Sequence, residues 1–269
     1  QDLAERLVAT VPEKALPFVL TVWLGDRQRI GGETYTTFVE SGIAHILAVS
    51  GVHIGIIYIT LAYGLRLLTK NSRYRIVVTL FAVGLFAFMA GARVSSLRAA
   101  IMVALYLSAE WFEREPDAPT ALGLSALLFG VHNPDVIFTV GFQLSYLSIA
   151  SLLLFRAPIA DRLERFPRWA REGVSAVLAV QILPIPATIL TFHLVSFGGF
   201  LANLVVIPLL SIVLCLSIAT TFLSYIMPPL APWFGHATTP VIWCIETIAD
   251  TTASLRFSHL YLTSPAWPA

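Results

Sequence analysis

Long apolar stretches, separated by short polar or charged segments, recur along the whole chain. They cover residues 42–68, 76–92, 97–112, 120–133, 136–155, 174–194, 199–226 and 233–256. A helix rises about 1.5 Å per residue, so roughly 20 apolar residues cross the ~30 Å hydrocarbon core of a bilayer. The stretches do not alternate apolar and polar residues with a period of two, as the strands of a transmembrane barrel do. The pattern therefore predicts an all-α fold, a polytopic transmembrane helical bundle of about eight spans, some of them broken.

Two further segments have helical character without the composition of a span. Residues 1–24 are predicted to form an amphipathic helix in the membrane interface, because burying their charges in lipid would be unfavourable. Residues 156–172 contain five arginines and three acidic residues, with apolar residues at roughly helical spacing. They are predicted to lie along the membrane surface. The charges and prolines of the first segment are Glu5, Arg6, Pro12, Glu13, Lys14 and Pro17.

Positive charge is concentrated in two loops. One follows the first span and holds Arg66, Lys70, Arg73 and Arg75, and the other is the segment 156–172. Four predicted crossings separate these loops, so they lie on the same side, and the positive-inside rule makes that side cytoplasmic. With eight spans the C-terminus lies outside. An acidic segment at 110–117 also falls on the cytoplasmic side, and acidic residues carry little weight in this rule.

Composition agrees with this class. The 269 residues are 57% hydrophobic and 12% charged, whereas a soluble domain has about 25% charged residues. Cys215 and Cys244 stand singly inside apolar runs, which predicts small core residues and no metal site. We predict no cofactor. Because the chain begins at Gln1 without a signal-peptide pattern, we expect it to be part of a longer protein.

Prolines and glycines interrupt the later apolar runs. The interruptions are LPIP at 183–186, SFGGFLAN at 196–203 and VIP at 206–208. Freed backbone groups are tolerated in a membrane only where protein or a watery cavity satisfies them. We therefore expect breaks at Pro184 and Pro208, and a cavity or channel nearby.

The segment SGIAHILAVSGVHIG at 41–55 places polar residues in the first span. On a helix Ser41 and His45 lie about 40° apart, while Ser50 and His53 lie on a different face. Either the helix breaks near Ser50 or polar partners surround it on several sides. Small residues of this kind allow close approach of helices. The structural glycine candidates are Gly42, Gly51 and Gly55.

Four interpretations of these residues remain open on spacing alone. The first is interhelical hydrogen bonding. The second, a zinc site, lacks a third ligand at suitable spacing. The third is an intramembrane serine protease with Ser50 as nucleophile and His193 or His236 as base. The fourth is a conduit lined by small and polar residues. The broken helices also suggest a secondary transporter for a small anion.

Other polar residues inside the apolar runs suit a conduit as well. Arg93 and Arg98 occur at a turn between two spans, where snorkelling to the surface is the alternative. Gln143 and Ser145 follow Asn133-Pro134, and Asn203 precedes Pro208. Interhelical hydrogen bonding is the alternative for these side chains.

Taken together, several motifs resemble one family, the competence domain of ComEC proteins, the inner-membrane channel for DNA uptake in naturally transformable bacteria. The resemblance covers about residues 20 to 210, and the block at 38–55 is the most specific part of it. The motifs are Leu24-Gly25-Asp26-Arg27, Phe38, Ser41-Gly42-x-x-His45-Ile46-Leu47-Ala48-Val49-Ser50-Gly51-Val52-His53, Ser95-Ser96-x-Arg98-Ala99 with Met102, Asn133-Pro134, Gly141-Phe142-Gln143-Leu144-Ser145-Tyr146, and Asn203 with Pro208.

The resemblance implies a function in natural transformation, the passage of one DNA strand across the bacterial cytoplasmic (inner) membrane. On this basis residues 1–269 form a single transmembrane channel domain that binds single-stranded DNA and is not an enzyme. The pore-lining or DNA-contacting candidates are Ser41, His45, Ser50, His53, Arg93, Arg98, Gln143, Ser145 and Asn203.

Family members also carry an OB-like domain and a metallo-β-lactamase-like nuclease domain. This sequence has no His-x-His-x-Asp-His motif, so any nuclease would lie elsewhere on the parent chain. It also has no Gly-x-x-x-x-Gly-Lys-Ser/Thr loop, which predicts a separate cytoplasmic helicase-like ATPase as partner. An extracellular DNA receptor is the other competence partner that the resemblance implies.

Overall fold

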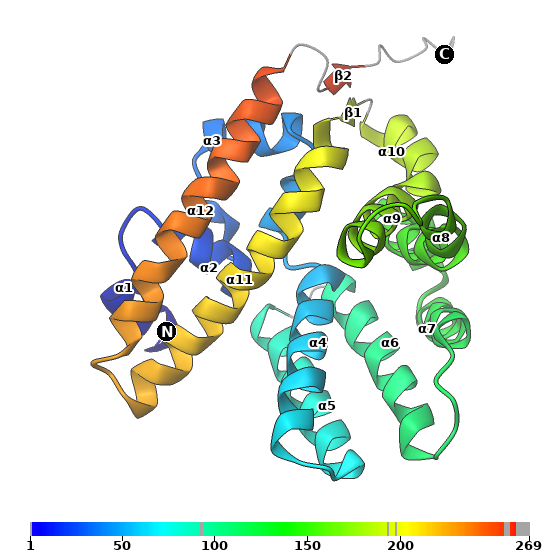
Figure 1. Ribbon diagram of the computed structural model, residues 1–269, viewed down its shortest axis with the longest axis horizontal. Coiled ribbons are helices and arrows are strands. Elements are labelled where there is room, and N and C mark those ends of the chain that lie inside the picture. Colours follow the sequence, from blue (N-terminus) through cyan, green and yellow to red (C-terminus); the bar gives the residue numbers. More distant parts are fainter. Residues whose placement is uncertain (1, 92–93, 193, 197, 256–258, 262–269) are drawn as a thin grey trace. The chain divides into compact units, whose positions relative to one another are not determined.

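The computed structural model describes residues 2–91, 94–192, 194–196, 198–255 and 259–261. Helices make up most of this part of the chain (Figure 1). The α-helices are α1 (Asp2–Thr10), α2 (Leu16–Leu24), α3 (Gly32–Glu40), α4 (Gly51–Leu68), α5 (Ser72–Met89), α6 (Val94–Trp111), α7 (Ala118–His132), α8 (Val140–Arg162), α9 (Arg168–Ile182), α10 (Pro184–Phe192), α11 (Gly198–Ile226) and α12 (Ala231–Ser254). Short 3-10 helices are η1 (Arg27–Arg29), η2 (Ala44–Leu47) and η3 (Pro134–Phe138). The strands β1 (Leu194–Ser196) and β2 (His259–Tyr261) form a two-stranded sheet.

The all-α prediction is confirmed, with those two short strands as the exception that the sequence pattern did not indicate. Within the described residues, four helices are long and apolar enough to cross a membrane: α4, α5, α8 and α11. The bent pair α9 and α10 makes a fifth candidate. Helices α6, α7 and α12 coincide with expected spans but do not meet this test, α7 because it has only 15 residues. The chain is thus a multi-pass membrane protein with fewer clear spans than the eight expected.

The chain divides into two compact units. Unit 1 contains residues 1–53, 89–92 and 196–259, and unit 2 contains residues 54–88, 93–195 and 260–269. Each unit combines segments that are distant in sequence.

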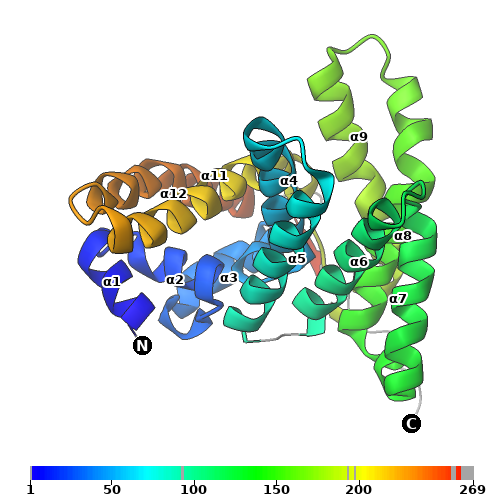
Figure 2. The same cartoon turned by 90° about the horizontal axis from the view of Figure 1, so that it is seen from below.

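Unit 1 is built on the hairpin of α11 and α12, which run side by side (Figure 1). Buried apolar side chains such as Val206, Leu210 and Ile245 lie along this hairpin. Helices α1 and α2 pack against it (Figure 2). The Arg6 guanidinium donates a 3.0 Å hydrogen bond to the Ser224 carbonyl near the end of α11 and lies 4.1 Å from the centre of the Tyr225 ring. These contacts attach α1 to the closed end of the hairpin.

Residues 1–24 form two helices where one was predicted. The chain leaves α1 after Thr10 and enters α2 at Leu16, and Pro12 lies in the connection. Proline has no backbone N–H and disfavours a helical conformation in the residue before it, which explains the break. Helix α2 is largely buried in unit 1, with Val19 and Val22 fully covered. Placement of the segment in the membrane interface stays a prediction.

In unit 2 the largest packed element is the hairpin of α8 and α9 (Figure 2). The expected break at Pro184 is confirmed, because α9 ends at Ile182 and α10 begins at Pro184 with a bend of 52°. The Leu183 N–H at this break donates a 3.1 Å hydrogen bond to the Ser151 hydroxyl of α8. A neighbouring helix thus satisfies the backbone donor at the break, as a break in a membrane helix requires.

Three expectations about helix boundaries are wrong. Helix α11 continues through Pro208 without a break, since a membrane helix tolerates an internal proline by small local adjustments. The first span does not begin at residue 42 but at Gly51, which confirms the alternative of a break near Ser50. The segment 156–172 does not form one continuous helix but contains the closed end of the α8–α9 hairpin, where α8 continues to Arg162 and α9 starts at Arg168, and its position along the membrane surface stays a prediction.

Candidate polar sites of the membrane domain

Ser50 begins α4 as its N-cap residue. The Val52 N–H donates to the Ser50 Oγ at 3.3 Å, the usual arrangement in which a capping hydroxyl satisfies a free donor of the first turn. The His53 ring folds back to the same residue, with its Nδ1 3.3 Å from both the Ser50 N–H nitrogen and the Ser50 Oγ. The sequence motif Ser-Gly-x-His is therefore, first of all, a helix start.

This capping contact determines which nitrogen of His53 carries a proton. Because Nδ1 accepts from the Ser50 backbone N–H, the neutral ring must carry its hydrogen on Nε2. His53 is fully buried, and its Nε2 has no hydrogen-bond partner among the residues that the structure describes. A buried donor without a partner is unfavourable by about 1–3 kcal/mol. The site therefore favours an acceptor such as water or substrate oxygen.

The geometry around Ser50 bears on the protease interpretation. The hydroxyl of Ser50 contacts the histidine of its own helical turn, and it also accepts the Val52 N–H. The Nδ1 of His236 lies 2.7 Å from the Pro232 carbonyl one turn earlier in α12. His193 lies outside the described residues. The arrangement at Ser50 is that of a helix cap.

The first Ser-Gly pair forms a close contact with the start of α11. Gly42 has φ of +76°, and a side chain there would place its Cβ 2.5 Å from the Ser196 Oγ. Gly199 faces this turn, since a Cβ on it would lie 3.2 Å from the Gly42 Cα. The Ser196 hydroxyl donates to the Glu40 carbonyl at 3.3 Å and accepts the Gly199 N–H at 3.1 Å. Two glycines thus let two distant segments of unit 1 meet.

The other candidates of this segment differ in exposure. Ser41 is fully buried, and its hydroxyl donates to the Phe38 carbonyl at 3.1 Å. His45 is exposed at η2. Gly51 is the exposed first residue of α4, and a Cβ at Gly55 would meet no atom within 4 Å. Of these glycines, Gly42 makes the close approach that was predicted.

Asn203 lies one helical turn after Gly199, so the two residues share a face of α11. The side chain is 7% exposed, and its Oδ1 has no hydrogen-bond partner within the described part of the chain. Other polar side chains of α11 are satisfied locally; for example, the Ser217 hydroxyl donates to the Val213 carbonyl at 2.7 Å. In the described part of unit 1, the buried polar atoms without a hydrogen-bond partner thus include a donor, the His53 Nε2, and an acceptor, the Asn203 Oδ1, and the Thr239 Oγ1 is another such atom.

Arg98 forms the polar centre of unit 2. It is 3% exposed on α6, and its NH2 group donates a 2.8 Å hydrogen bond to the Gly141 carbonyl at the start of α8. Its guanidinium carbon lies 5.8 Å and 6.0 Å from the ring centres of Phe142 and Tyr146. Those two rings stack with centroids 4.1 Å apart, and the Tyr146 hydroxyl donates to the Ser125 Oγ of α7 at 3.2 Å. One arginine thus connects three helices.

The remaining candidates are dispersed. On α8, Gln143 is exposed and Ser145 is half-buried. Arg93 lies outside the described residues. The structure therefore brings Ser50 and His53 together, and does not bring Gln143 or Ser145 to Arg98.

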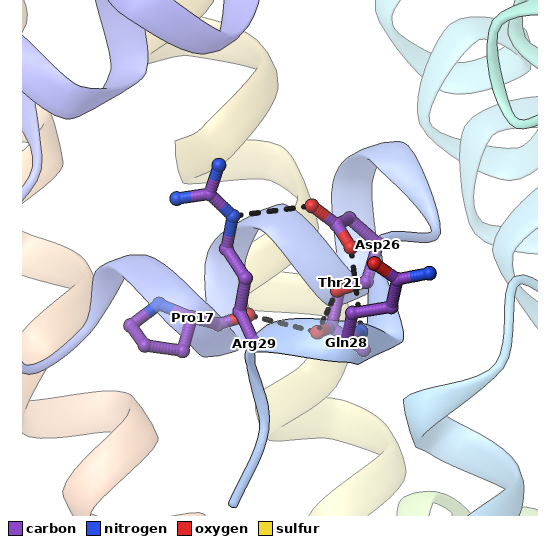
Figure 3. Close-up of polar contacts among 5 residues, drawn as sticks. All are labelled: Pro17, Thr21, Asp26, Gln28 and Arg29. Atoms are coloured by element: carbon purple, nitrogen blue, oxygen red, sulfur yellow. Dashed lines mark hydrogen bonds and ion pairs between the residues drawn. The ribbon is translucent and has the colours of Figure 1, made fainter.

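The Leu24-Gly25-Asp26-Arg27 motif closes α2 (Figure 3). Gly25 has φ of +76°, a left-handed conformation that favours glycine at a helix end. The Thr21 hydroxyl lies 2.8 Å from the Pro17 carbonyl and 2.7 Å from the Asp26 carbonyl (Figure 3). The Asp26 carboxylate accepts the Gln28 backbone N–H at 3.3 Å and the Arg29 Nε–H at 3.1 Å. This motif builds a turn.

Sequence reasoning missed two contacts. It did not pair Arg98 with Phe142 and Tyr146, although two aromatics at i, i+4 on one helix face were a usable signal. It also did not connect Gly42 with Gly199, because nothing in a single sequence indicates which distant glycines meet.

Comparison with known proteins gives a consistent result. Residues 22–269 match the family described as "Competence protein". ComE operon protein 3 of Bacillus subtilis (strain 168) is 29% identical over 74% of this chain and 25% of its own length. Recombination protein 2 of Haemophilus influenzae is 24% identical over 73% of this chain and 27% of its own length. The uncharacterized protein YcaI of Escherichia coli (strain K12) is 21% identical over 99% of this chain and 38% of its own length.

The chain spans between a quarter and two fifths of the length of these three relatives. No solved structure matches it.

Proposed function

Because the chain belongs to the competence protein family, we propose that it is a membrane channel domain through which single-stranded DNA crosses the bacterial cytoplasmic membrane. A strand carries one charge per phosphate, so its passage needs a wet path with polar contacts weak enough to release it. The domain acts as a conduit and not as an enzyme. Its driving force comes from a partner ATPase in the cytoplasm, and an extracellular DNA receptor supplies the strand.

The observation that carries this proposal is that two buried groups of unit 1, the His53 ring and the Asn203 amide, are not satisfied within the described residues. His53 presents an Nε2–H and Asn203 presents an Oδ1, and neither has a partner in the described residues. A purely structural membrane core would be expected to satisfy such groups, since lipid offers no hydrogen bonds. Water or a hydrated substrate along this part of unit 1 would satisfy both.

Arg98 has a different role in this proposal. Its charge is already engaged by the Gly141 carbonyl and two aromatic rings, so it holds α6, α7 and α8 in register. It is then a positioning residue for the channel. Its side chain does not need to touch DNA.

A thiol-accessibility experiment tests the wet path. In a chain with Cys215 and Cys244 replaced by serine, Asn203→Cys is compared with Ser217→Cys, a buried position of α11 whose hydroxyl is satisfied locally. We expect a small hydrophilic thiol reagent to label the first variant about tenfold faster, and single-stranded DNA to slow that labelling. Equal and slow labelling of both positions would contradict a path along this face of α11.

The same experiment separates the alternatives. Protection by small anions but not by DNA would favour a secondary transporter. Ser50→Ala gives the complementary test: a protease would lose all peptide cleavage, whereas the conduit retains DNA uptake because the change removes only the capping contact with Val52 and the hydroxyl contact with the His53 ring, while the Ser50 backbone N–H still binds that ring.

A further inference from the structure

A loop joins α6 to α7 in unit 2 (Figure 1). This loop borders a groove of about 700 Å³. Apolar side chains from both helices form the floor of the groove, among them Leu105, Ala109 and Leu124. Its rim is polar and includes Arg114, Glu115 and Asp117. Phe112 also lines the groove and is 71% exposed. An apolar floor with a charged rim is the usual form of a groove that binds an amphipathic segment.

The rim is electronegative for three reasons. Within residues 112–117, the carboxylates of Glu113, Glu115 and Asp117 outnumber the cation Arg114. The C-terminal end of α6, which carries a partial negative charge, points to this loop. The Thr120 hydroxyl and N–H lower the pKa of the Asp117 carboxyl, so it stays ionised. A cationic partner would therefore be favoured here, and an anionic lipid headgroup would be disfavoured.

Glu113 occupies the position where glycine is usually found. Its φ is +57°, and the Arg114 N–H bonds the Ala109 carbonyl at 2.8 Å while the Glu113 N–H bonds the Glu110 carbonyl at 3.1 Å. This is the Schellman end of a helix, in which a glycine would avoid the strain of a left-handed residue. The chain thus has a carboxylate where fold stability alone favours glycine.

From this groove and its charge we propose that the α6–α7 loop docks a basic amphipathic segment of a cytoplasmic protein, with apolar side chains in the groove and lysine or arginine at the rim. The side of the membrane rests on the proposed function, in which the loop faces the cytoplasm. The acidic segment at 110–117, unexplained by the positive-inside rule, then has a role in partner binding.

The test uses the whole chain in nanodiscs of uncharged lipid and a fluorescein-labelled helical peptide of leucine and lysine. We expect Glu115→Lys to raise the Kd of the peptide by at least about fivefold at ~0.15 M salt. Glu164→Lys, the same change at an exposed position beyond the end of α8, serves as matched control and should leave the Kd unchanged. Equal effects of the two substitutions, or no effect of either, would overturn the proposal.

A second variant separates docking from folding. Glu113→Gly should raise the unfolding temperature, because it relieves the left-handed residue, and should still raise the Kd about twofold. A peptide with glutamate in place of lysine, and one with serine in place of leucine, should both bind weakly. If the serine peptide binds as tightly as the original, the groove is not the docking site, and non-specific electrostatic attraction alone accounts for the binding.

A separate experiment measures on which side of the membrane the α6–α7 loop lies. In a chain with Cys215 and Cys244 replaced by serine, Glu115→Cys should react with an impermeant thiol reagent in inverted vesicles and not in intact cells. Reaction in intact cells would overturn a cytoplasmic partner and the topology of the proposed function. The peptide affinity would then still report on the groove itself.

Discussion

Arg98 of unit 2 and the residues His53 and Asn203 of unit 1 differ in how their buried polar groups are surrounded. In unit 2 the end of the Arg98 guanidinium contacts a carbonyl and two aromatic rings, although its Nε has no hydrogen-bond partner among the described residues, and the Tyr146 hydroxyl extends the network to a third helix. In unit 1 the His53 Nε2 and the Asn203 Oδ1 are buried with no partner in the described residues. The comparison teaches that a charged residue inside a membrane domain can be structural, while two neutral residues mark the better candidates for contact with water or substrate.

The largest effect on stability is expected for a substitution at the close contact between Gly42 and Gly199 in unit 1. Gly42→Val introduces a side chain at φ of +76° against the Ser196 hydroxyl and the Gly199 backbone. We expect a loss of about 2–4 kcal/mol of stability, measured as thermal or denaturant unfolding in detergent.

Gly55→Val is the matched control for this substitution, because a Cβ at Gly55 meets open space within a helix. It should be neutral or slightly stabilising. An equal loss of stability in the two variants would show that the contact between Gly42 and Gly199 does not hold unit 1.

Arg98→Met should have the next largest effect. It removes a charge-assisted hydrogen bond to Gly141 and two ring contacts, which together contribute about 2–3 kcal/mol. We expect the stability of this variant, measured by unfolding, to fall, and any loss of DNA uptake to accompany that fall. Normal stability with abolished uptake would instead assign Arg98 to DNA contact, and the contrast between the units would fail.

Tyr146→Phe should have a smaller effect in the same direction. It keeps the aromatic stack and removes only the hydrogen bond to Ser125, worth about 1 kcal/mol. In combination with Arg98→Met the effects should not be additive, because both residues belong to one network. Unfolding of the single and double variants measures this coupling.

Arg6→Ala tests whether Arg6 attaches α1 to the α11–α12 hairpin of unit 1. It removes a hydrogen bond to the Ser224 carbonyl and a contact with the Tyr225 ring, so we expect a loss of about 1–2 kcal/mol. Faster hydrogen exchange confined to α1 and the closed end of the α11–α12 hairpin would support local detachment. Unchanged exchange there would contradict a fastening role for Arg6.

Sequence patterns predicted the helical membrane class and the break at Pro184, because apolar length and missing backbone donors act locally. They failed at Pro208, where the same residue type is accommodated inside a long helix. They located Ser50, His53, Arg98 and Asn203 as candidates but not their environments. Whether such a side chain is satisfied depends on partners distant in sequence, as the Arg98 carbonyl partner 43 residues away illustrates.

The helix start at Ser50 is only partly predictable from the sequence. A serine followed by glycine is a plausible N-cap, so a break near Ser50 was foreseen as one of two options. The capping bond to Val52 identifies which option the chain adopts. The contact of the His53 ring with the same residue could not be derived from spacing alone, since it depends on the rotamer of the ring.

The most direct test of the account is DNA uptake measured beside stability in cells that carry Asn203→Leu in the native gene. Leucine fills nearly the same space without a polar atom, so we expect the unfolding temperature in detergent to stay the same or rise, because an unpaired acceptor is removed. Uptake of fluorescent DNA into the cytoplasm should fall about tenfold at equal protein level, while Ser217→Ala stays near the unaltered chain. Unaltered uptake with Asn203→Leu would contradict the central claim that the unsatisfied polar groups of unit 1 line the path.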